Sequence, residues 1–255
     1  MRPSRKNEFG LTVALAEMSP LLFCQGKYVR RVTPKLPEAA GGRSGESGSG
    51  PSLRLLVLGD SAAAGVGVAT QDDALIGQTV KRLQHRFQVF WRLEAQSGAT
   101  ARSTIARLKT AEPEAFDAVA ISLGVNEVTC GRRVSTWLAE LDELAHLLRT
   151  KFSAQRMLWS GVPCMHEFPA LPQPLRWYLG TRAALLDKAL KAWVTRQRDS
   201  DFVAAPASGY GPMMAEDGFH PGPKVYELWG TEVARYLEAI SIPRATVELE
   251  TKQQQ

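Results

Sequence analysis

The sequence predicts an α/β fold in which helices cover both faces of a parallel sheet. Short apolar runs alternate with segments of helical periodicity from residue 52 onward. The first run, Leu53–Leu58, is almost continuously apolar, as expected of a strand that is buried on both faces. Small and polar residues directly follow several of the runs. In parallel sheets, functional side chains gather in the loops at the carboxyl ends of the strands, so this position also favours the fold.

The elements follow one another in regular order. Apolar runs predict five strands at residues 53–58, 87–93, 117–123, 156–162 and 202–205. Helical segments follow them at residues 71–86, 100–110, 134–151, 176–198 and 223–239. The third segment is clearly amphipathic, because Trp137, Leu141 and Leu144 recur on one side of a helix. Right-handed crossovers between parallel strands then place helices on both faces of the sheet.

Composition divides the 255 residues into four parts. Residues 1–40 form an arm that is basic and partly apolar, and residues 41–51 read as a flexible Gly/Ser linker. Residues 52–243 form the folded domain, and residues 244–255 form a polar tail. The domain is long enough to bury a substantial core.

The positive charge is concentrated in the arm. Residues 1–50 hold eight of the 31 Lys and Arg residues and four of the 26 Asp and Glu residues, which leaves the rest of the chain nearly neutral. A nucleic-acid-binding domain would carry a basic face on its folded part. The charge distribution therefore argues against a nucleic-acid partner.

The cysteines favour a reducing compartment. Cys24, Cys130 and Cys164 are widely spaced, and an odd number cannot all pair within one chain. We therefore expect a cytoplasmic protein, with peripheral membrane association or export as the alternatives. The sequence does not indicate an oligomeric state.

The arm contains one apolar stretch, residues 11–24. It is too short to span a bilayer and includes Glu17 and Pro20. No site of the small-x-small type follows it, which disfavours a cleaved signal peptide. We expect a short helix that docks on the domain or lies on a membrane surface.

A serine follows the first predicted strand in the sequence Gly59-Asp60-Ser61. Small residues allow a sharp turn there, which would expose the serine hydroxyl at the sheet edge. Taken alone, this loop is also compatible with a phosphate-binding loop or a simple turn. A phosphate loop would need a third glycine or a Gly-Lys-Ser/Thr ending, which the segment 65–67 does not provide.

An aspartate and a histidine, Asp217 and His220, lie three residues apart before the last helical segment. An Asp–His hydrogen bond would fix the tautomer of the imidazole. Taken alone, the pair is equally compatible with a capping aspartate and a surface histidine. Together with Ser61 it supplies the nucleophile, the base and the orienting acid of a serine hydrolase.

Two further residues follow strands two and three. Gly98 would let a backbone N–H group approach a ligand closely, and the side-chain amide of Asn126 could donate to a developing oxyanion. A turn glycine and a capping asparagine are the simpler interpretations of each residue alone.

These four blocks stand in the order Ser61, Gly98, Asn126, His220, and in that order the chain resembles an SGNH (GDSL-type) hydrolase over about residues 53–240. The resemblance implies a flavodoxin-like three-layer α/β/α fold and ester hydrolysis without a metal or organic cofactor. It implies that Ser61 is the nucleophile, His220 the base and Asp217 its orienting acid. The N–H groups of Ser61 and Gly98 and the side chain of Asn126 would form the oxyanion hole.

One position departs from the family pattern. The third block usually reads Gly-x-Asn-Asp, whereas here Glu127 follows Asn126. Because the asparagine is the implied donor, we expect the longer acid to tune the rate rather than abolish it.

A proline-rich segment, residues 168–178, follows the fourth predicted strand at the expected site edge. It is interpreted either as a rigid connection or as an apolar wall for an acyl group. In the second interpretation the substrate-binding side chains are Phe168, Leu171, Leu175 and Trp177. Cys164 and His166 are half of a metal site without a second pair, so we expect no metal.

The sequence thus predicts a serine esterase that acts through an acyl-enzyme on an acyl-ester or lysophospholipid-like substrate. The arm adds an expectation of peripheral membrane contact. The alternatives are a carbohydrate O-deacetylase of the same fold and a non-catalytic flavodoxin-like module that binds a small ligand.

Overall fold

The computed structural model describes residues 5–205, 209 and 211–239, with side chains from residue 19 onward. The expected polar tail, residues 244–255, and the last residues of the expected domain lie outside the described residues.

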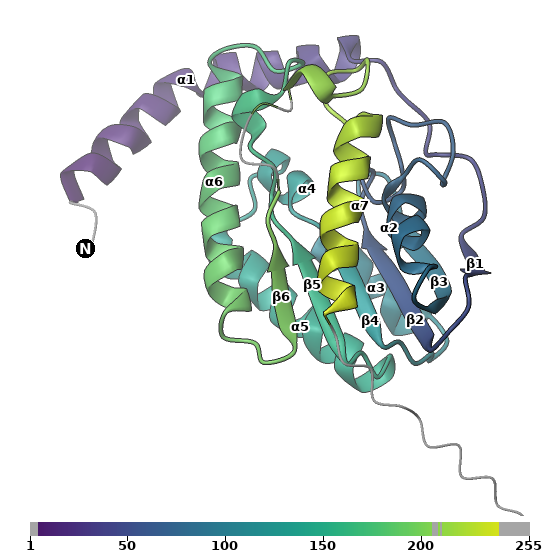
Figure 1. Cartoon of the computed structure of the whole chain (residues 1–255). Coiled ribbons are helices and arrows are strands. Elements are labelled where there is room, and N and C mark those ends of the chain that lie inside the picture. Colours follow the sequence, from purple (N-terminus) through teal and green to yellow (C-terminus); the bar gives the residue numbers. More distant parts are fainter. Residues whose placement is uncertain (1–4, 206–208, 210, 240–255) are drawn as a thin grey trace, which may run out of the picture.

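The described chain forms one six-stranded sheet in the order β1-β3-β2-β4-β5-β6 (Figure 1). The strands are β1 (Ser44–Ser47), β2 (Ser52–Gly59), β3 (Gln88–Ala95), β4 (Ala118–Ser122), β5 (Arg156–Ser160) and β6 (Ser200–Val203). Strands β2 to β6 pair in parallel, and β1 pairs with β3 antiparallel. The predicted parallel sheet is confirmed, and its strand order is that of a flavodoxin-like fold.

The sixth strand corrects the expected flexibility of residues 41–51, because β1 lies within them. The composition indicates a linker. Without β1, however, β3 would be an edge strand with a row of unpaired backbone groups, and residues 44–47 pair with that edge. Ser44 pairs with Arg92, and Ser47 pairs with Val89. A side chain at Gly45 would collide with the Trp91 ring, so only glycine lets that ring pack against the β1 backbone.

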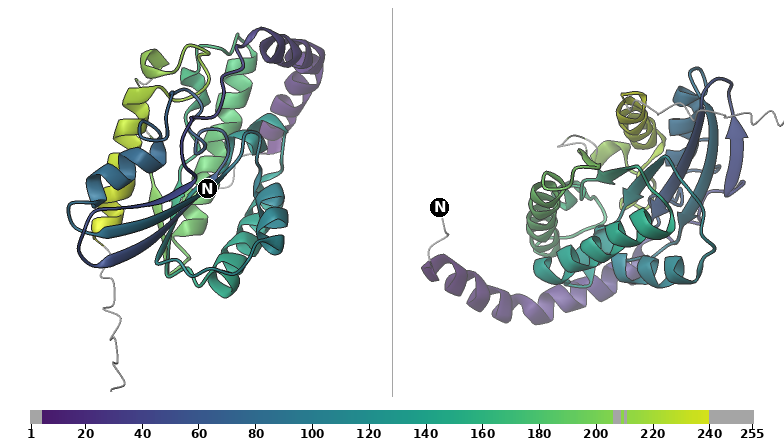
Figure 2. Two further views of the ribbon diagram at one scale, coloured as in Figure 1. Left: turned by 90° about the vertical axis from the view of Figure 1, so that its right-hand side faces the viewer. Right: turned by 90° about the horizontal axis from the view of Figure 1, so that it is seen from below.

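Helices cover both faces of the sheet, which gives three layers (Figure 2). Helices α2 (Leu75–Leu83) and α7 (Pro223–Glu238) lie on one face, where they share a core with Leu55 and Val57. Alternate residues of β2, Leu56 and Leu58, point to the other face. That face packs against α3 (Ala101–Thr110), α5 (Val134–Lys151) and α6 (Leu175–Val194).

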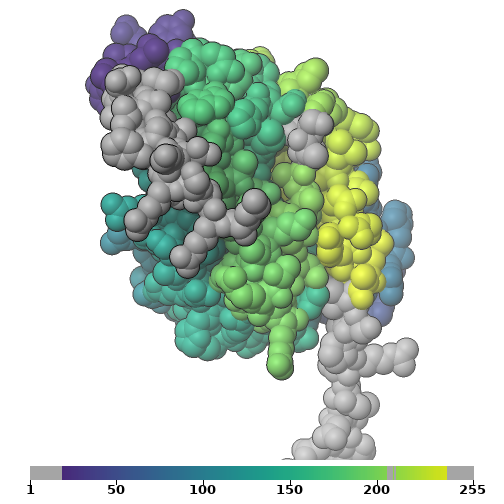
Figure 3. All heavy atoms as spheres, turned by 90° about the vertical axis from the view of Figure 1, so that its left-hand side faces the viewer, coloured from purple at the N-terminus to yellow at the C-terminus, as the bar shows by residue number. Residues whose placement is uncertain are grey.

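The arm forms a helix longer than expected, α1 (Arg5–Val32), with Pro20 inside it. Figure 2 shows that this helix bends as it crosses the domain, as a proline inside a helix allows. Its C-terminal half docks beside the start of α6 (Figure 3), where Leu22 and Val29 are buried. The Gln25 side chain donates to the Gln173 carbonyl at 2.7 Å and accepts from the Leu175 N–H at 3.1 Å. Among the described residues, no helix is both long and apolar enough to cross a bilayer.

Candidate active site

The structure brings Ser61, His220 and Asp217 into one hydrogen-bonded chain at the carboxyl end of the sheet. Ser61 follows β2, and the other two residues lie in the loop that leads into α7. His220 Nε2 lies 2.9 Å from Ser61 Oγ, and His220 Nδ1 lies 2.5 Å from Asp217 Oδ2. With the Nδ1 proton directed to the carboxylate, Nε2 presents its lone pair to the serine hydroxyl.

The Asp217 carboxylate is held by its own loop as well as by the imidazole. Its Oδ1 atom accepts hydrogen bonds from the backbone N–H groups of Phe219 and His220, both at 2.9 Å. Burial raises the pKa of Asp217, but the hydrogen bonds from the His220 side chain and the two N–H groups outweigh burial and hold the pKa below its usual value. The carboxylate is therefore ionised near neutral pH and fixed in orientation.

The predicted oxyanion donors are the N–H groups of Ser61 and Gly98 and the Asn126 amide. Within the described residues, neither the Ser61 nor the Gly98 backbone N–H group donates to a protein acceptor. Gly98 has a φ of 80°, a conformation that favours glycine and that turns the chain after β3. Asn126 lies in the short helix α4 (Val125–Thr129), and its amide donates to the Ala99 carbonyl at 2.9 Å. That bond ties the asparagine to the turn that carries Gly98.

The acid next to the serine, Asp60, is buried, and its carboxylate binds other partners than the His220 imidazole. Its Oδ1 atom accepts from the Ala62 N–H at 3.0 Å, and its Oδ2 atom lies 3.5 Å from the Asn126 amide nitrogen. Burial, with a smaller contribution from the charge of Glu127, raises the pKa of Asp60 to about 7, although the Ala62 hydrogen bond opposes the rise. Through these contacts Asp60 stabilises the turn after β2 and links it to Asn126.

Glu127, the departure from the family pattern, is fully buried beneath the same loops. Its Oε1 atom accepts from the Ala101 N–H at 2.6 Å, in the first turn of α3. Burial raises the pKa of Glu127, and the Ala101 hydrogen bond offsets that rise only in part. The longer acid therefore links α4 to the start of α3, directly after the Gly98 turn, and so supports both donors indirectly.

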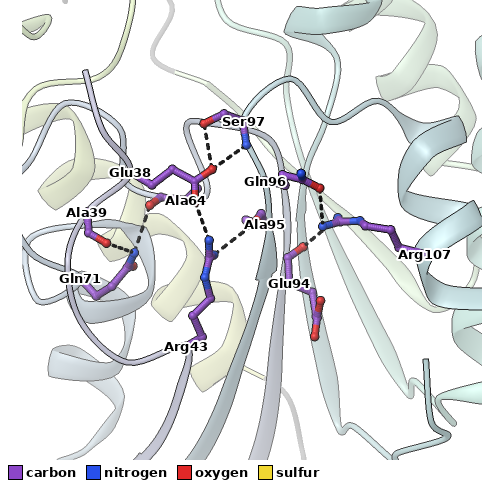
Figure 4. Close-up of polar contacts among 10 residues, drawn as sticks. All are labelled: Glu38, Ala39, Arg43, Ala64, Gln71, Glu94, Ala95, Gln96, Ser97 and Arg107. Atoms are coloured by element: carbon purple, nitrogen blue, oxygen red, sulfur yellow. Dashed lines mark hydrogen bonds and ion pairs between the residues drawn. The ribbon is translucent and has the colours of Figure 1, made fainter. Parts of the chain in front are cut away.

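Glu38 and Arg43 form a polar clamp on Ser97, the residue before Gly98 (Figure 4). Glu38 Oε1 accepts from the N–H and the hydroxyl of Ser97, at 2.7 and 2.9 Å. The other oxygen pairs with Arg43, which also donates to the Ala95 carbonyl at 3.0 Å. Burial raises the pKa of Glu38, but the Ser97 hydrogen bonds and the positive Arg43 outweigh it and bring the pKa below its usual value.

The same segment reaches the turn after Ser61. The Gln71 side-chain amide donates to the carbonyls of Ala39 and Ala64, at 3.1 and 3.0 Å, and Ala39 N–H donates to Ala64 O at 3.2 Å. Sequence reasoning missed Glu38, because a single acid in a basic arm has no pattern that signals a partner 59 residues away.

Comparison with known families agrees with this geometry. The sequence matches the model of the GDSL-like lipase/acylhydrolase family over residues 57–228, more than half of the chain. The chain belongs to this family. A search of curated proteins finds no match. The GDSL match includes all of the serine, glycine, asparagine and histidine blocks and leaves out α1, Glu38 and β1.

Solved structures share the GDSL fold at low sequence identity. A lipolytic G-D-S-L family protein from Veillonella parvula is 14% identical with a TM-score of 0.59, and the match covers 73% of this chain and 99% of that one. A lipase/acylhydrolase from Enterococcus faecalis is 21% identical with a TM-score of 0.56, covering 73% and 96%. The acetylxylan esterase Axe2 from Geobacillus stearothermophilus is 18% identical with a TM-score of 0.51, covering 76% and 96%. At these identities the likeness shows the fold.

A small apolar cavity of about 80 Å³ lies beside Ser61 and His220. Phe168, one of the predicted substrate-binding residues, lines it and packs edge to face against Phe219 at 5.1 Å. The far wall includes Trp229, whose indole N–H donates to the Ser160 hydroxyl at 3.0 Å. Ser61 and His220 therefore line the same apolar recess as Phe168 and Trp229.

The other predicted substrate-binding residues lie elsewhere. Leu171 and Leu175 line a larger groove of about 540 Å³ between α1 and α6. Trp177 differs from the prediction, because it is 39% exposed and lines neither cavity. It lies on the opposite side of α6 from Leu175 and Leu179, which follows from the helical spacing of these residues.

The described residues hold no group of three or more His, Cys, Asp or Glu side chains that could bind a metal ion. Cys164 Sγ lies 3.9 Å from His166 Nδ1.

Proposed function

We propose that this protein is a serine esterase that hydrolyses carboxylic esters through an acyl-enzyme intermediate. The observation that carries the proposal is the continuous hydrogen-bonded chain from Ser61 Oγ through His220 to Asp217. Membership of the GDSL-like lipase/acylhydrolase family supports the same chemistry. A ligand-binding module without catalysis would have no use for a serine, a histidine and an acid aligned in this order.

In the proposed first half-reaction, Ser61 Oγ attacks the acyl carbon of the ester while His220 Nε2 accepts the hydroxyl proton. Asp217 stabilises the imidazolium that forms, because its carboxylate already accepts the Nδ1 proton. The tetrahedral intermediate then expels the alcohol, which takes the proton from Nε2. This leaves the acyl group bound to Ser61.

In the second half-reaction, a water molecule attacks the acyl carbon and passes a proton to His220 Nε2. Collapse of the intermediate returns that proton to Ser61 Oγ and releases the carboxylic acid. Both intermediates carry negative charge on the former carbonyl oxygen. The N–H groups of Ser61 and Gly98, which have no protein acceptor among the described residues, and the Asn126 amide would bind that charge.

The substrate that we propose for this esterase is an acyl ester with a lipid-like chain. The apolar lining of the cavity beside Ser61 and of the groove at Leu171 and Leu175 supports it. The similar lipase/acylhydrolase from Enterococcus faecalis offers a precedent on this fold.

A carbohydrate O-deacetylase is the second candidate. The cavity beside Ser61, at about 80 Å³, is the observation in its favour, because an acetyl group needs little space. Axe2, named as an acetylxylan esterase, has the same fold.

The test combines a p-nitrophenyl ester series with fluorophosphonate labelling of the full chain. We expect wild type to turn over esters and to be labelled at Ser61. Ser61→Ala should lose both, with a loss in rate of roughly 10⁴-fold or more and an unchanged circular dichroism spectrum. Undiminished turnover in Ser61→Ala would exclude the proposal. Turnover of acetyl esters alone would favour the deacetylase.

A further inference from the structure

Helix α1 forms one wall of a groove that ends at the candidate active site. Phe23, Gly26 and Arg30 face the groove from α1, and Leu175 and Leu179 face it from α6. The groove is continuous over about 540 Å³. In Figure 1, α1 crosses the end of the molecule at which the loops from the carboxyl ends of the strands gather.

Two residues connect the groove to the site. Asn126, which carries a proposed oxyanion donor, is one of the residues that line the groove. Phe219 lines both the groove and the small cavity beside Ser61, and its ring lies 5.4 Å from the imidazole of His220. A substrate whose carbonyl oxygen is held by Asn126 therefore has the groove as a path for an attached chain.

The size of each space decides which of them can hold a long chain. The cavity beside Ser61 has about 80 Å³, whereas small-molecule sites are usually roughly 300–1,000 Å³. The groove, at about 540 Å³, lies within that range. Its walls include Leu22, Leu171 and Leu175, which offer apolar surface to methylene groups.

The glycine inside α1, Gly26, is a further argument that the groove holds a ligand. Glycine in a helix interior destabilises the helix by about 1 kcal/mol relative to alanine. In α6 and α7 neighbouring atoms explain the glycines, because a Cβ at Gly180 would lie 2.4 Å from His166, and one at Gly230 would lie 2.6 Å from Gln78. A Cβ at Gly26 would meet nothing within 4 Å. No neighbour requires this glycine, which keeps the groove wide at the middle of its α1 wall.

We propose that the groove between α1 and α6 binds the acyl chain of the ester substrate, so that α1 determines a preference for long acyl chains. The inference rests on the proposed esterase function and names its substrate class. The part of the chain responsible lies outside the region matched by the family model.

The experiment fills the groove from Gly26 and compares two substrates. Gly26→Ala, Gly26→Leu and Gly26→Trp add side chains of increasing size into open space, and each residue favours a helix more than glycine does. The measured quantity is the ratio of kcat/KM for p-nitrophenyl decanoate to that for p-nitrophenyl acetate. We expect the ratio to fall with the size of the side chain, by about tenfold for Gly26→Trp, which corresponds to the loss of roughly two methylene contacts.

Cys24→Trp is the matched control. Cys24 is exposed on α1 and does not line the groove, so the same indole is added to the same helix on another side. We expect this variant to keep the wild-type ratio.

Either of two results would overturn the inference. These are an unchanged ratio in Gly26→Trp, or a fall in Cys24→Trp equal to that in Gly26→Trp. Failure of the esterase assignment looks different, since wild type would then turn over neither substrate in a Ser61-dependent way.

Discussion

The loops after β2, β4 and β6 and the N-terminal segment 19–47 meet at the same site but contribute different kinds of contact. The loops supply the side chains that are proposed to react, and short hydrogen bonds such as those of Asp217 hold them. The N-terminal segment supplies a groove wall and the hydrogen bonds from Ser97 to Glu38. The family match covers the first region and not the second. The two proposals thus assign chemistry and substrate preference to separable parts of the chain, and changes in each region can test this division.

Replacing Asn126 by alanine tests the catalytic region and should have the largest effect of these changes. Loss of one oxyanion donor lowers kcat roughly 100- to 1,000-fold, equivalent to about 3–4 kcal/mol of barrier, while KM for a short ester changes little. Steady-state kinetics with p-nitrophenyl acetate measure this. A kcat within a few-fold of wild type would show that the N–H groups of Ser61 and Gly98 suffice.

Replacing Glu38 by alanine tests whether the N-terminal segment stays outside the chemistry. The change removes the acceptor for the Ser97 N–H and hydroxyl, which should loosen the Gly98 turn. We expect kcat to fall by about tenfold or less, because Glu38 is only partly buried and water can replace the lost acceptor. Glu38→Gln keeps an acceptor oxygen and should restore most of the rate.

The measurement is kcat and KM, determined separately on p-nitrophenyl acetate, for wild type, Glu38→Ala and Glu38→Gln. The expected fall in kcat, rescued by Gln, would make Glu38 a positioning residue that acts on the chemistry only through the Gly98 turn. Equal kcat in wild type and Glu38→Ala would sharpen the division between the two regions.

The pH dependence of stability tests the buried acid in the catalytic region. The pKa of Asp60 is about 7 in the folded protein and about 4 in an unfolded chain. Because the folded pKa is the higher one, its contribution to stability is complete below about pH 4 and is lost as the pH rises towards 7. Over that range wild type should lose up to about 1.4 kcal/mol of unfolding free energy per pH unit relative to Asp60→Asn.

Urea unfolding of both proteins at several values between pH 4 and 8 measures the Asp60 difference. Parallel curves for the two proteins would mean that Asp60 is already ionised in the fold.

The sequence predicted the parallel strands to within a few residues, because strands buried on both faces are unbroken apolar runs between loops of small residues. It predicted α5 as Val134–Lys151, which the structure confirms. It missed the five-residue helix α4, which is too short to show periodicity. It also missed β1, since four Ser, Gly and Glu residues form a strand only where a neighbouring edge offers partners.

The residues predicted as the triad and the oxyanion hole follow strands of one sheet, although the sequence showed only their types and their order. Four loops after parallel strands converge because the sheet places the carboxyl ends of its strands along one edge. Contacts made by Glu38 and Gln25 could not be predicted, because they depend on where a segment before the first parallel strand crosses that edge. Trp177 was predicted to line the substrate site because it is large and apolar. Its position on α6 instead turns it away from both cavities and leaves it exposed.

The hydrogen bond between Ser61 and His220 joins residues 159 positions apart, and His220 lies in the last loop before the final described helix. During synthesis Ser61 is made early, and His220 is made only after all six strands of the described sheet. If His220 is the base, a nascent or truncated chain that ends before this loop has an unreactive Ser61, however well its earlier strands pair. Labelling of Ser61 by a fluorophosphonate would thus report completion of folding, so the site can serve as its own probe of assembly.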